Sequence, residues 1–204
     1  MPRALDLRVL HPGLVLGSLV LLLGCGDDGI APEPAPPPSR VEAVGARRSD
    51  PAERFCDRSA PEGEGMLFTL PAIEGEPAWS AGGWRYLNAW ASWCAPCVEE
   101  MPLLSGWEPL FAGEGQPIDV WFLNVDATPE AAAAFHASHA DAPASARLSD
   151  PAGLPALVGA LGLDAGATLP IHALVDPSGH VRCVRTGAVG ERDFDTVLEI
   201  VRGR

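Results

Sequence analysis

Two cysteines separated by two residues, Cys94 and Cys97, stand where a predicted strand gives way to a predicted helix. A pair with this spacing can close a small disulfide, and the N-terminal end of a helix favours the thiolate form of the first cysteine. Pro96 falls in the first turn of the helix, where a missing amide hydrogen leaves no hydrogen bond unmade. The pattern predicts thiol–disulfide exchange, in which Cys94 forms a mixed disulfide with a partner and Cys97 resolves it by internal attack.

The same pair has three other interpretations that the sequence leaves open. One is a purely structural disulfide. Another is half of a zinc site, although the chain has no second closely spaced cysteine pair to complete it. The third is a copper(I)-binding assembly factor that uses Cys94, Cys97 and His172, since soft thiolates suit copper(I). The main interpretation assigns no metal to the site, and copper(I) binding is the alternative function.

The overall composition excludes several other chemistries. The 204 residues carry 14 basic and 27 acidic side chains, and the net charge of −13 argues against a nucleic-acid partner. Every basic side chain is an arginine, so mechanisms that need a Schiff-base lysine or a phosphate-loop lysine are excluded. Thiol–disulfide exchange needs only cysteine, a helix end and a proton acceptor, and we therefore expect no cofactor.

Residues 1–24 have the pattern of a signal peptide. Two early arginines precede an apolar run at 14–23, which is too short to span a membrane. The run ends in Gly24-Cys25, and this ending resembles the bacterial lipobox, in which the cysteine is acylated and becomes the mature N-terminus. We expect Cys25 to anchor the protein by lipid to a membrane of the cell envelope, facing the periplasmic or extracytoplasmic side. An ordinary secretory signal with a chance cysteine is the alternative.

The rest of the chain divides into a linker and one domain. Residues 25–62 are expected to form the anchor and a flexible linker, because five prolines between 26 and 40 favour an extended, solvated chain. Residues 63–204 have a length that suits a single hydrophobic core, and they contain no visible internal repeat.

The elements that must position the cysteines follow from the apolar patterning of this domain. A strand at 84–90 leads into the cysteine pair, a helix is expected over 99–111, and the apolar run 118–125 predicts a buried central strand. Thr128 before Pro129 is typical of a helix start. Strands that alternate with helices in this order pair in parallel.

The last third of the chain changes to an antiparallel pattern. Apolar-rich runs at 171–176 and 180–186 flank a Pro-Ser-Gly turn, so a β-hairpin is expected. Apolar residues at helical spacing predict a final amphipathic helix over 192–201. The predicted fold class is α/β, with a mixed central sheet, helices on both faces, and a C-terminal β-hairpin plus helix.

Residues 63–204 resemble the thioredoxin-like family, and within it the membrane-anchored TlpA/ResA group of thiol-disulfide oxidoreductases. The matching segments are 88–97, which spans the cysteine pair, Glu99-Glu100-Met101-Pro102, Leu169-Pro170, and Leu174-Val175-Asp176 with Gly179. The resemblance implies a thioredoxin-like fold with Cys94 as the attacking cysteine and Cys97 as the resolving cysteine.

The resemblance also assigns residues around the disulfide. It implies that Pro170 is a cis-proline lying against the disulfide, and a trans-proline that opens a strand is the alternative. It implies a docking surface for an extended substrate peptide, formed by Trp93, Ala95, Pro96 and Leu169. His172 follows Pro170 by two residues and should project on the same side of the strand. It is therefore a candidate for a role near the redox pair.

A proton acceptor is needed near the resolving thiol. Family thioredoxins place a buried aspartate six residues before the first cysteine, where this sequence has Asn88, which cannot titrate. Glu100 follows Cys97 by three residues on the same helix face, and the TlpA/ResA group carries a glutamate at this place. If Glu100 is buried, its pKa rises and it can accept the proton of Cys97. The alternative is an exposed acid of the first helical turn, which suits Glu99 better.

Cys56 and Cys183 remain after the other cysteines are assigned. Spare cysteines usually pair in an oxidising compartment, so a structural disulfide between these two is expected. It would close a loop of more than a hundred residues, which stabilises the fold by roughly 4 to 5 kcal/mol in the chain-entropy model. Two free or partly buried thiols are the alternative.

The resemblance implies a lipid-anchored thiol–disulfide oxidoreductase that acts on the thiols and disulfides of other proteins as a reductant. It suggests a role in cytochrome c maturation or in oxidase and copper-protein assembly, with electrons from a membrane thiol-reductant donor. A peroxidase is disfavoured, because Leu87 and Ala91 stand where the family's peroxidatic pattern has proline and threonine or serine. A noncatalytic interaction module is the remaining alternative.

Overall fold

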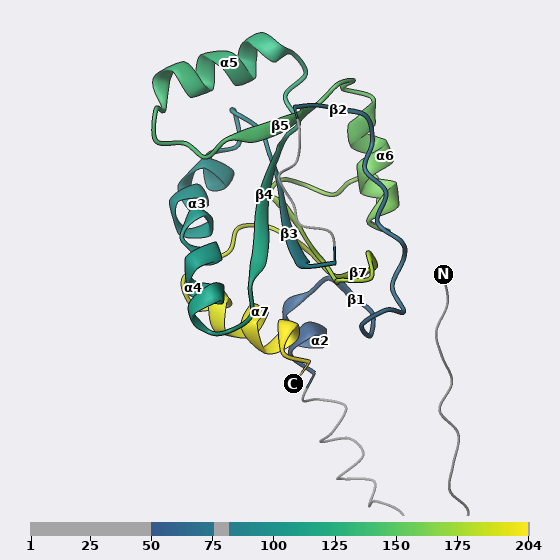
Figure 1. Cartoon of the computed structure of the whole chain (residues 1–204). Helices are drawn as coiled ribbons and strands as arrows, with labels where there is room; N and C mark the ends of the chain where they lie inside the picture. Colours follow the sequence, from purple (N-terminus) through teal and green to yellow (C-terminus); the bar gives the residue numbers. More distant parts are fainter. Residues whose placement is uncertain (1–49, 76–81, 204) are drawn as a thin grey trace, which may run out of the picture. The chain divides into compact units, whose positions relative to one another are not determined.

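Residues 50–75 and 82–203 are described by a computed structural model of the chain (Figure 1). The predicted signal peptide 1–24, Cys25 and the linker up to residue 49 lie outside these residues. Among the helices of this described part, none combines the length and the apolar character needed to cross a membrane.

Within the described ranges, seven strands form one mixed sheet in the order β1-β7-β6-β3-β4-β5-β2. The strands are β1 Arg58–Ser59, β2 Ile73–Glu74, β3 Trp84–Trp90, β4 Ile118–Asn124, β5 Ser145–Leu148, β6 Ile171–Val175 and β7 Val181–Thr186. The pairs β3–β4 and β4–β5 are parallel, whereas β6 pairs antiparallel with both β3 and β7. The predicted order of parallel strands followed by a hairpin is therefore present.

Helices cover both faces of this sheet. They are α2 Pro51–Phe55, α3 Ala95–Ser105, α4 Trp107–Gly113, α5 Pro129–Ser138, α6 Gly153–Ala160 and α7 Asp193–Val201. Figure 1 shows α3, α4 and α7 on one side of the central strands and α6 on the other. The α/β fold class predicted from the sequence is confirmed, including the final hairpin and helix.

The hydrophobic core forms around β3, which is buried at every residue except the half-buried Arg85. Such a continuous apolar run suits a central strand with helices on both sides. Tyr86 of β3 packs edge-on against Trp107 of α4, with 5.0 Å between ring centroids. Phe111 of α4 packs against Phe194 of α7 at 4.7 Å, so these aromatic contacts hold both helices on the sheet.

The helix expected over 99–111 is two helices that meet at Gly106. α3 begins earlier than expected, at Ala95, and continues through Pro102 to Ser105. The proline removes one backbone donor, yet the helix does not end there. The break comes at Gly106, which is the C-cap of α3 and the N-cap of α4.

The folded part also begins before the expected boundary at residue 63. Residues 50–62 lie within the predicted flexible linker 25–62, but they include α2 and β1. The Asp50 side chain accepts a hydrogen bond from the Ala52 N–H at 2.9 Å, and both Ala52 and Phe55 are buried. β1 pairs antiparallel with β7, and Cys56 is disulfide-bonded to Cys183. The segment is ordered because the cap, the buried apolar side chains and the disulfide act together.

Candidate active site

The carboxyl end of β3 carries the cysteine pair. Cys94 and Cys97 are joined by a disulfide, and their Cα atoms are 5.3 Å apart. Cys97 is fully buried, whereas Cys94 is 5% exposed. The more accessible sulfur-bearing residue is thus the first of the two, which suits the role of attacking cysteine.

The disulfide lies at the N-terminus of α3. Cys94 is the N-cap residue with an extended backbone, and it makes no side-chain capping bond. Its carbonyl accepts a hydrogen bond from the Val98 N–H at 3.1 Å, which begins the helix. The positive end of the helix dipole therefore faces the sulfur of Cys94 and stabilises its thiolate once the disulfide is reduced.

Asp126 holds the loop between β3 and α3. It is buried, and its carboxylate accepts hydrogen bonds from the Ser92 N–H at 3.1 Å and the Ser92 hydroxyl at 3.0 Å. The Asn124 side-chain amide also donates to Asp126, at 2.8 Å. These hydrogen bonds join the loop before Cys94 to the end of β4, so Asp126 helps to fix the position of Cys94.

A cis-proline lies at the same edge of the sheet. The peptide bond between Leu169 and Pro170 is cis. Pro170 directly precedes β6, in which Ile171 pairs with Ala89 of β3. This register brings the proline next to the end of β3, where the cysteine loop begins. The Gly187 N–H donates a hydrogen bond to the Pro170 carbonyl at 2.9 Å, which links the proline to the residue that follows β7.

Glu100 faces the interior of the domain, whereas its neighbour Glu99 is exposed. One Glu100 oxygen accepts from the Asn88 side-chain amide at 2.8 Å, and the other accepts from the Val189 N–H at 2.8 Å. Burial raises the pKa of Glu100 to about 7, although the bonds from Val189 and Asn88 oppose the rise. A carboxyl group with this pKa can take up and release a proton near neutral pH.

His172 completes a buried polar cluster with these groups. Its Nε2 lies 3.5 Å from a Glu100 oxygen, and its Nδ1 lies 3.4 Å from the Asn88 amide nitrogen. Burial, followed by the charge of Arg185, lowers the pKa of His172 to about 3, while a hydrogen bond with the backbone of Gly187 opposes the shift. The imidazole is therefore neutral at physiological pH.

Solved structures of other proteins share this fold. A thiol-disulfide isomerase from Corynebacterium glutamicum aligns with a TM-score of 0.51 at 17% identity, over 69% of this chain and 98% of that chain. The thioredoxin-related protein from Neisseria meningitidis serogroup B aligns with a TM-score of 0.50 at 23% identity, over 64% of this chain and 93% of that chain. At these identities the likeness concerns the fold alone.

One curated relative adds a sequence match. The chain is 25% identical over 117 residues to the thiol-disulfide oxidoreductase ResA of Geobacillus kaustophilus (strain HTA426). The chain is similar in sequence to this ResA protein, and it shares the thioredoxin-like fold of the solved structures. The match spans 57% of this chain and 62% of the relative, which is less than two thirds of the relative's own length. No protein-family model matches the chain.

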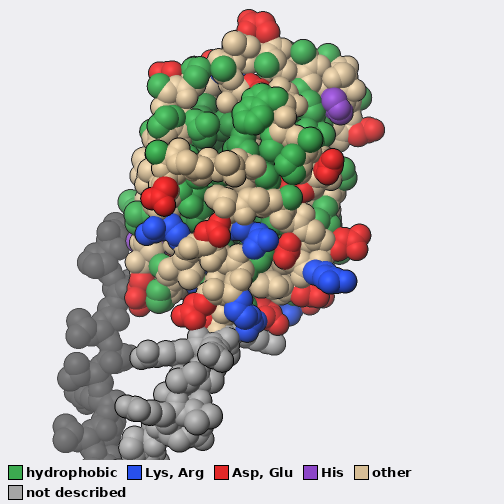
Figure 2. All heavy atoms as spheres, turned by 180° about the vertical axis from the view of Figure 1, so that it is seen from behind, with side chains coloured by type: hydrophobic (Ala, Val, Ile, Leu, Met, Phe, Trp, Pro, Cys, Tyr) green, Lys and Arg blue, Asp and Glu red, His purple; other side chains and the backbone are tan. Residues whose placement is uncertain are grey.

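The residues expected to dock a substrate differ in exposure. Trp93 is 71% exposed, Ala95 and Pro96 are also exposed, and Leu169 is half-buried. Exposed tryptophans are enriched where proteins contact one another, and this one is adjacent in the chain to Cys94. Figure 2 shows that apolar side chains gather on the upper half of one face of the molecule, whereas the arginines lie on its lower half.

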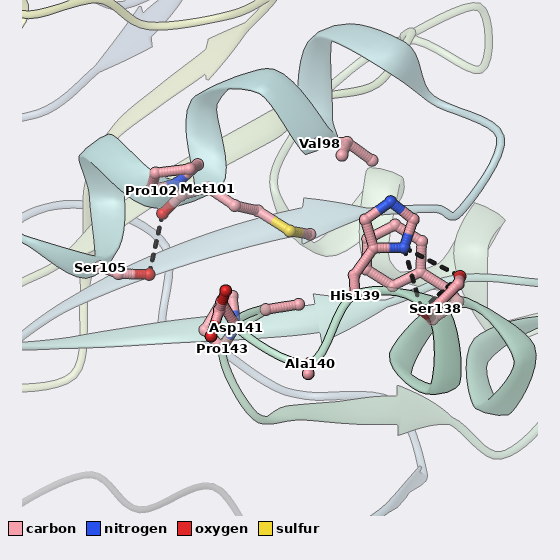
Figure 3. A pocket seen from close by; sticks show the side chains of 11 residues that line it. Val98, Met101, Pro102, Ser105, Ser138, His139, Ala140, Asp141 and Pro143 are labelled. Atoms are coloured by element: carbon pink, nitrogen blue, oxygen red, sulfur yellow. Dashed lines mark hydrogen bonds between the residues drawn. The ribbon is translucent and has the colours of Figure 1, made fainter.

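A groove of about 590 Å³ lies between α3 and the C-terminal end of α5. Its lining residues are Val98, Met101, Pro102, Ser105, Phe135, Ser138, His139, Ala140, Asp141, Ala142 and Pro143. Figure 3 shows the Met101 side chain extending from α3 toward His139. Val98 follows Cys97 in the chain, so the groove is next to the helix that carries the disulfide.

The alternative metal interpretations find no ligand cluster in the described ranges. Among residues 50–75 and 82–203, no group of three or more His, Cys, Asp or Glu side chains is arranged to hold a metal ion. His172, the third ligand of the copper(I) interpretation, faces Glu100 and Asn88.

Two groups that position this site do not follow from the sequence analysis. Asp126 has a usable sequence signal, because it is a polar residue shortly after a buried strand and strand ends line one edge of a sheet. Val189 has no such signal. Its backbone N–H donates a hydrogen bond to Glu100 from a loop 89 residues away, and no local sequence pattern predicts such a contact.

Proposed function

We propose that the chain is a thiol–disulfide oxidoreductase whose reacting groups are Cys94 and Cys97. The observation that carries this proposal is the disulfide at the start of α3, which shares a sheet edge with cis-Pro170 and precedes the buried Glu100 by one helical turn. The relative from Geobacillus kaustophilus is itself named a thiol-disulfide oxidoreductase, which supports the proposal.

In the reduced protein, the Cys94 thiolate attacks one sulfur of a substrate disulfide, and the other substrate sulfur leaves as a thiolate. Cys97 then gives its proton to the Glu100 carboxylate and attacks the Cys94 sulfur in the mixed disulfide. This step releases the second substrate thiolate and closes the Cys94–Cys97 disulfide. Two electrons pass to the substrate in each cycle, so a dithiol donor must return two electrons to the pair.

Substrates of this oxidoreductase are protein disulfides presented as an extended segment. The docking surface consists of Trp93, Ala95, Pro96 and Leu169, around Cys94. Support comes from the exposure of Trp93 and from the position of Leu169 directly before the cis-proline. Because Pro170 has no amide hydrogen, the backbone next to the disulfide leaves room for the chain of a substrate.

The setting that we propose is the cell envelope. Cys25 anchors the protein by lipid after removal of residues 1–24, and the linker holds the domain away from the membrane. Cys94 and Cys97 act as a reductant, supplied by a membrane thiol donor, on proteins of cytochrome c maturation or of oxidase and copper-protein assembly. The lipobox-like Gly24-Cys25 ending and the resemblance to the TlpA/ResA group support this setting.

Replacing Glu100 by glutamine should slow resolution of the mixed disulfide. In the wild type, the rate of this step should rise with pH through about 7, because Glu100 must be ionised before it can accept the Cys97 proton. Glutamine cannot accept it, so at pH 7 the rate should fall by about 10²-fold. Rapid mixing of the reduced protein with a peptide disulfide, followed by mass spectrometry of the quenched mixed disulfide, measures the step.

The exposed neighbour provides the matched control for this experiment. Glu99→Gln removes the same charge from the same helix and should keep the wild-type rate and pH profile. An unchanged profile in Glu100→Gln would contradict the role of Glu100, whereas failure of the wild-type protein to reduce the peptide at all would contradict the proposed function itself.

A further inference from the structure

His172 and Glu100 face each other inside the domain from different elements. The two side chains are each 2% exposed, and 3.5 Å separates the imidazole Nε2 from a carboxylate oxygen. Asn88 connects them, because its amide nitrogen donates to Glu100 at 2.8 Å and contacts His172 Nδ1 at 3.4 Å. Sheet register creates this arrangement, since Asn88 of β3 pairs directly with His172 of β6.

The contact with Asn88 decides which ring nitrogen of His172 carries the proton. An amide nitrogen only donates hydrogen bonds, so the Nδ1 atom that it contacts must be the acceptor. The neutral ring then carries its hydrogen on Nε2, the atom that faces Glu100. Nε2 is buried and has no hydrogen-bond partner among the described residues within standard limits, and a Glu100 oxygen lies 3.5 Å from it. The backbone of Gly187, which also interacts with the ring, is the competing acceptor.

The charged and titratable groups around this pair come from three further places. Arg185 of β7 pairs with His172 in the sheet, and its charge lowers the pKa of both Glu100 and His172. Its guanidinium is held beside α2, where it donates to the Phe55 carbonyl at 2.8 Å. The ring centroids of Tyr86 and His172 are 5.6 Å apart. Burial raises the pKa of Tyr86, and the charges of Glu100 and of Asp193 in α7 also raise it.

We propose that His172 is a positioning residue that sets how tightly Glu100 holds its proton, by directing its Nε2–H at the carboxylate. The ionised carboxylate accepts one hydrogen bond on each oxygen. The imidazole Nε2 lies 3.5 Å from one of these oxygens, and an N–H directed at the oxygen from there stabilises the charge. His172 stays neutral throughout, and the proton moves only between the Cys97 sulfur and Glu100. The effect of His172 on turnover rests on the proposed function, in which Glu100 accepts the Cys97 proton.

The test is the titration of Glu100 in the oxidised full-length protein, followed by NMR of ¹³C-labelled glutamate. In His172→Leu, the midpoint of Glu100 should rise by about one pH unit, a tenfold gain in proton affinity, because an apolar side chain donates no bond. In His172→Gln, whose amide can reach the place of Nε2, the midpoint should stay within a few tenths of the wild-type value.

Equal midpoints in wild type and His172→Leu, or equal shifts in both variants, would overturn the proposal. His172→Asn serves if the leucine variant does not fold, since its shorter amide keeps the contact with Asn88 but does not reach Glu100; it should also raise the midpoint. No substrate is present, so the titration decides the role of His172 even if the protein reduces nothing. If the titration shifts but the pH profile of mixed-disulfide resolution does not, the function assigned to Glu100 fails while that of His172 stands.

Discussion

Replacing Cys94 by serine should lower the rate of protein-disulfide reduction by at least about 10³-fold, to the uncatalysed background. A serine hydroxyl is not ionised at neutral pH and does not attack a disulfide sulfur, and Cys97 is fully buried, so it cannot replace Cys94 as the attacking group. The reduction of a peptide disulfide by the pre-reduced protein measures the loss. Turnover retained in Cys94→Ser would contradict the assignment.

Replacing Cys97 by serine should have a different outcome. Cys94 still attacks, but no internal thiol resolves the product, so the variant should accumulate a mixed disulfide with its substrate. Mass spectrometry of the intact protein should then show the mass of one substrate added at Cys94. Cys56 and Cys183, which are bonded to each other, should carry no adduct.

Removal of the disulfide between Cys56 and Cys183 should cause the largest loss of stability. The bond joins residues 127 apart in the chain, so in the chain-entropy model the double variant Cys56→Ala, Cys183→Ala should lose about 5 kcal/mol of the free energy of unfolding. Chemical denaturation with urea, with the Cys94–Cys97 disulfide intact in both proteins, measures the difference.

The redox chemistry supplies the control for this experiment. Cys56 lies after α2 and Cys183 lies in β7, so neither belongs to the cysteine loop or to α3. Below its unfolding midpoint, the double variant should therefore reduce a peptide disulfide at the wild-type rate. A loss of less than about 1 kcal/mol would contradict a structural role, and a loss of activity in the folded variant would show that this disulfide takes part in exchange.

The long central elements could be predicted from the sequence because their apolar runs are continuous. β3 and β4 coincide with the runs at 84–90 and 118–125, and the hairpin of β6 and β7 follows its turn residues. β1 and β2 have only two residues each, and each is held by a partner strand far away in the chain. α6 contains Gly153, Pro155 and Gly159, which are poor helix formers, so packing and not local propensity makes it a helix.

The reacting groups of the site could be predicted for a similar reason, since Cys94, Cys97 and Glu100 lie within seven residues of one helix start. Their supporting contacts come from distant strands and loops. The pairing of Asn88 with His172 depends on sheet register, which chain spacing does not encode. The bonds from Val189 to Glu100 and from Ser92 to Asp126 depend on loop paths that only the folded structure defines.

The reduction potential of the Cys94–Cys97 disulfide tests the proposed function most directly. The oxidised protein would be equilibrated with dithiothreitol or glutathione buffers, and mass spectrometry after alkylation would give the reduced fraction of each cysteine pair. We expect a midpoint near that of thioredoxin, about −270 mV, which is the range of a protein-disulfide reductant. A pair that stays oxidised well below about −300 mV would be a structural disulfide, and a midpoint near about −120 mV would make the protein an oxidant. Either result would contradict the reductant function proposed for this chain.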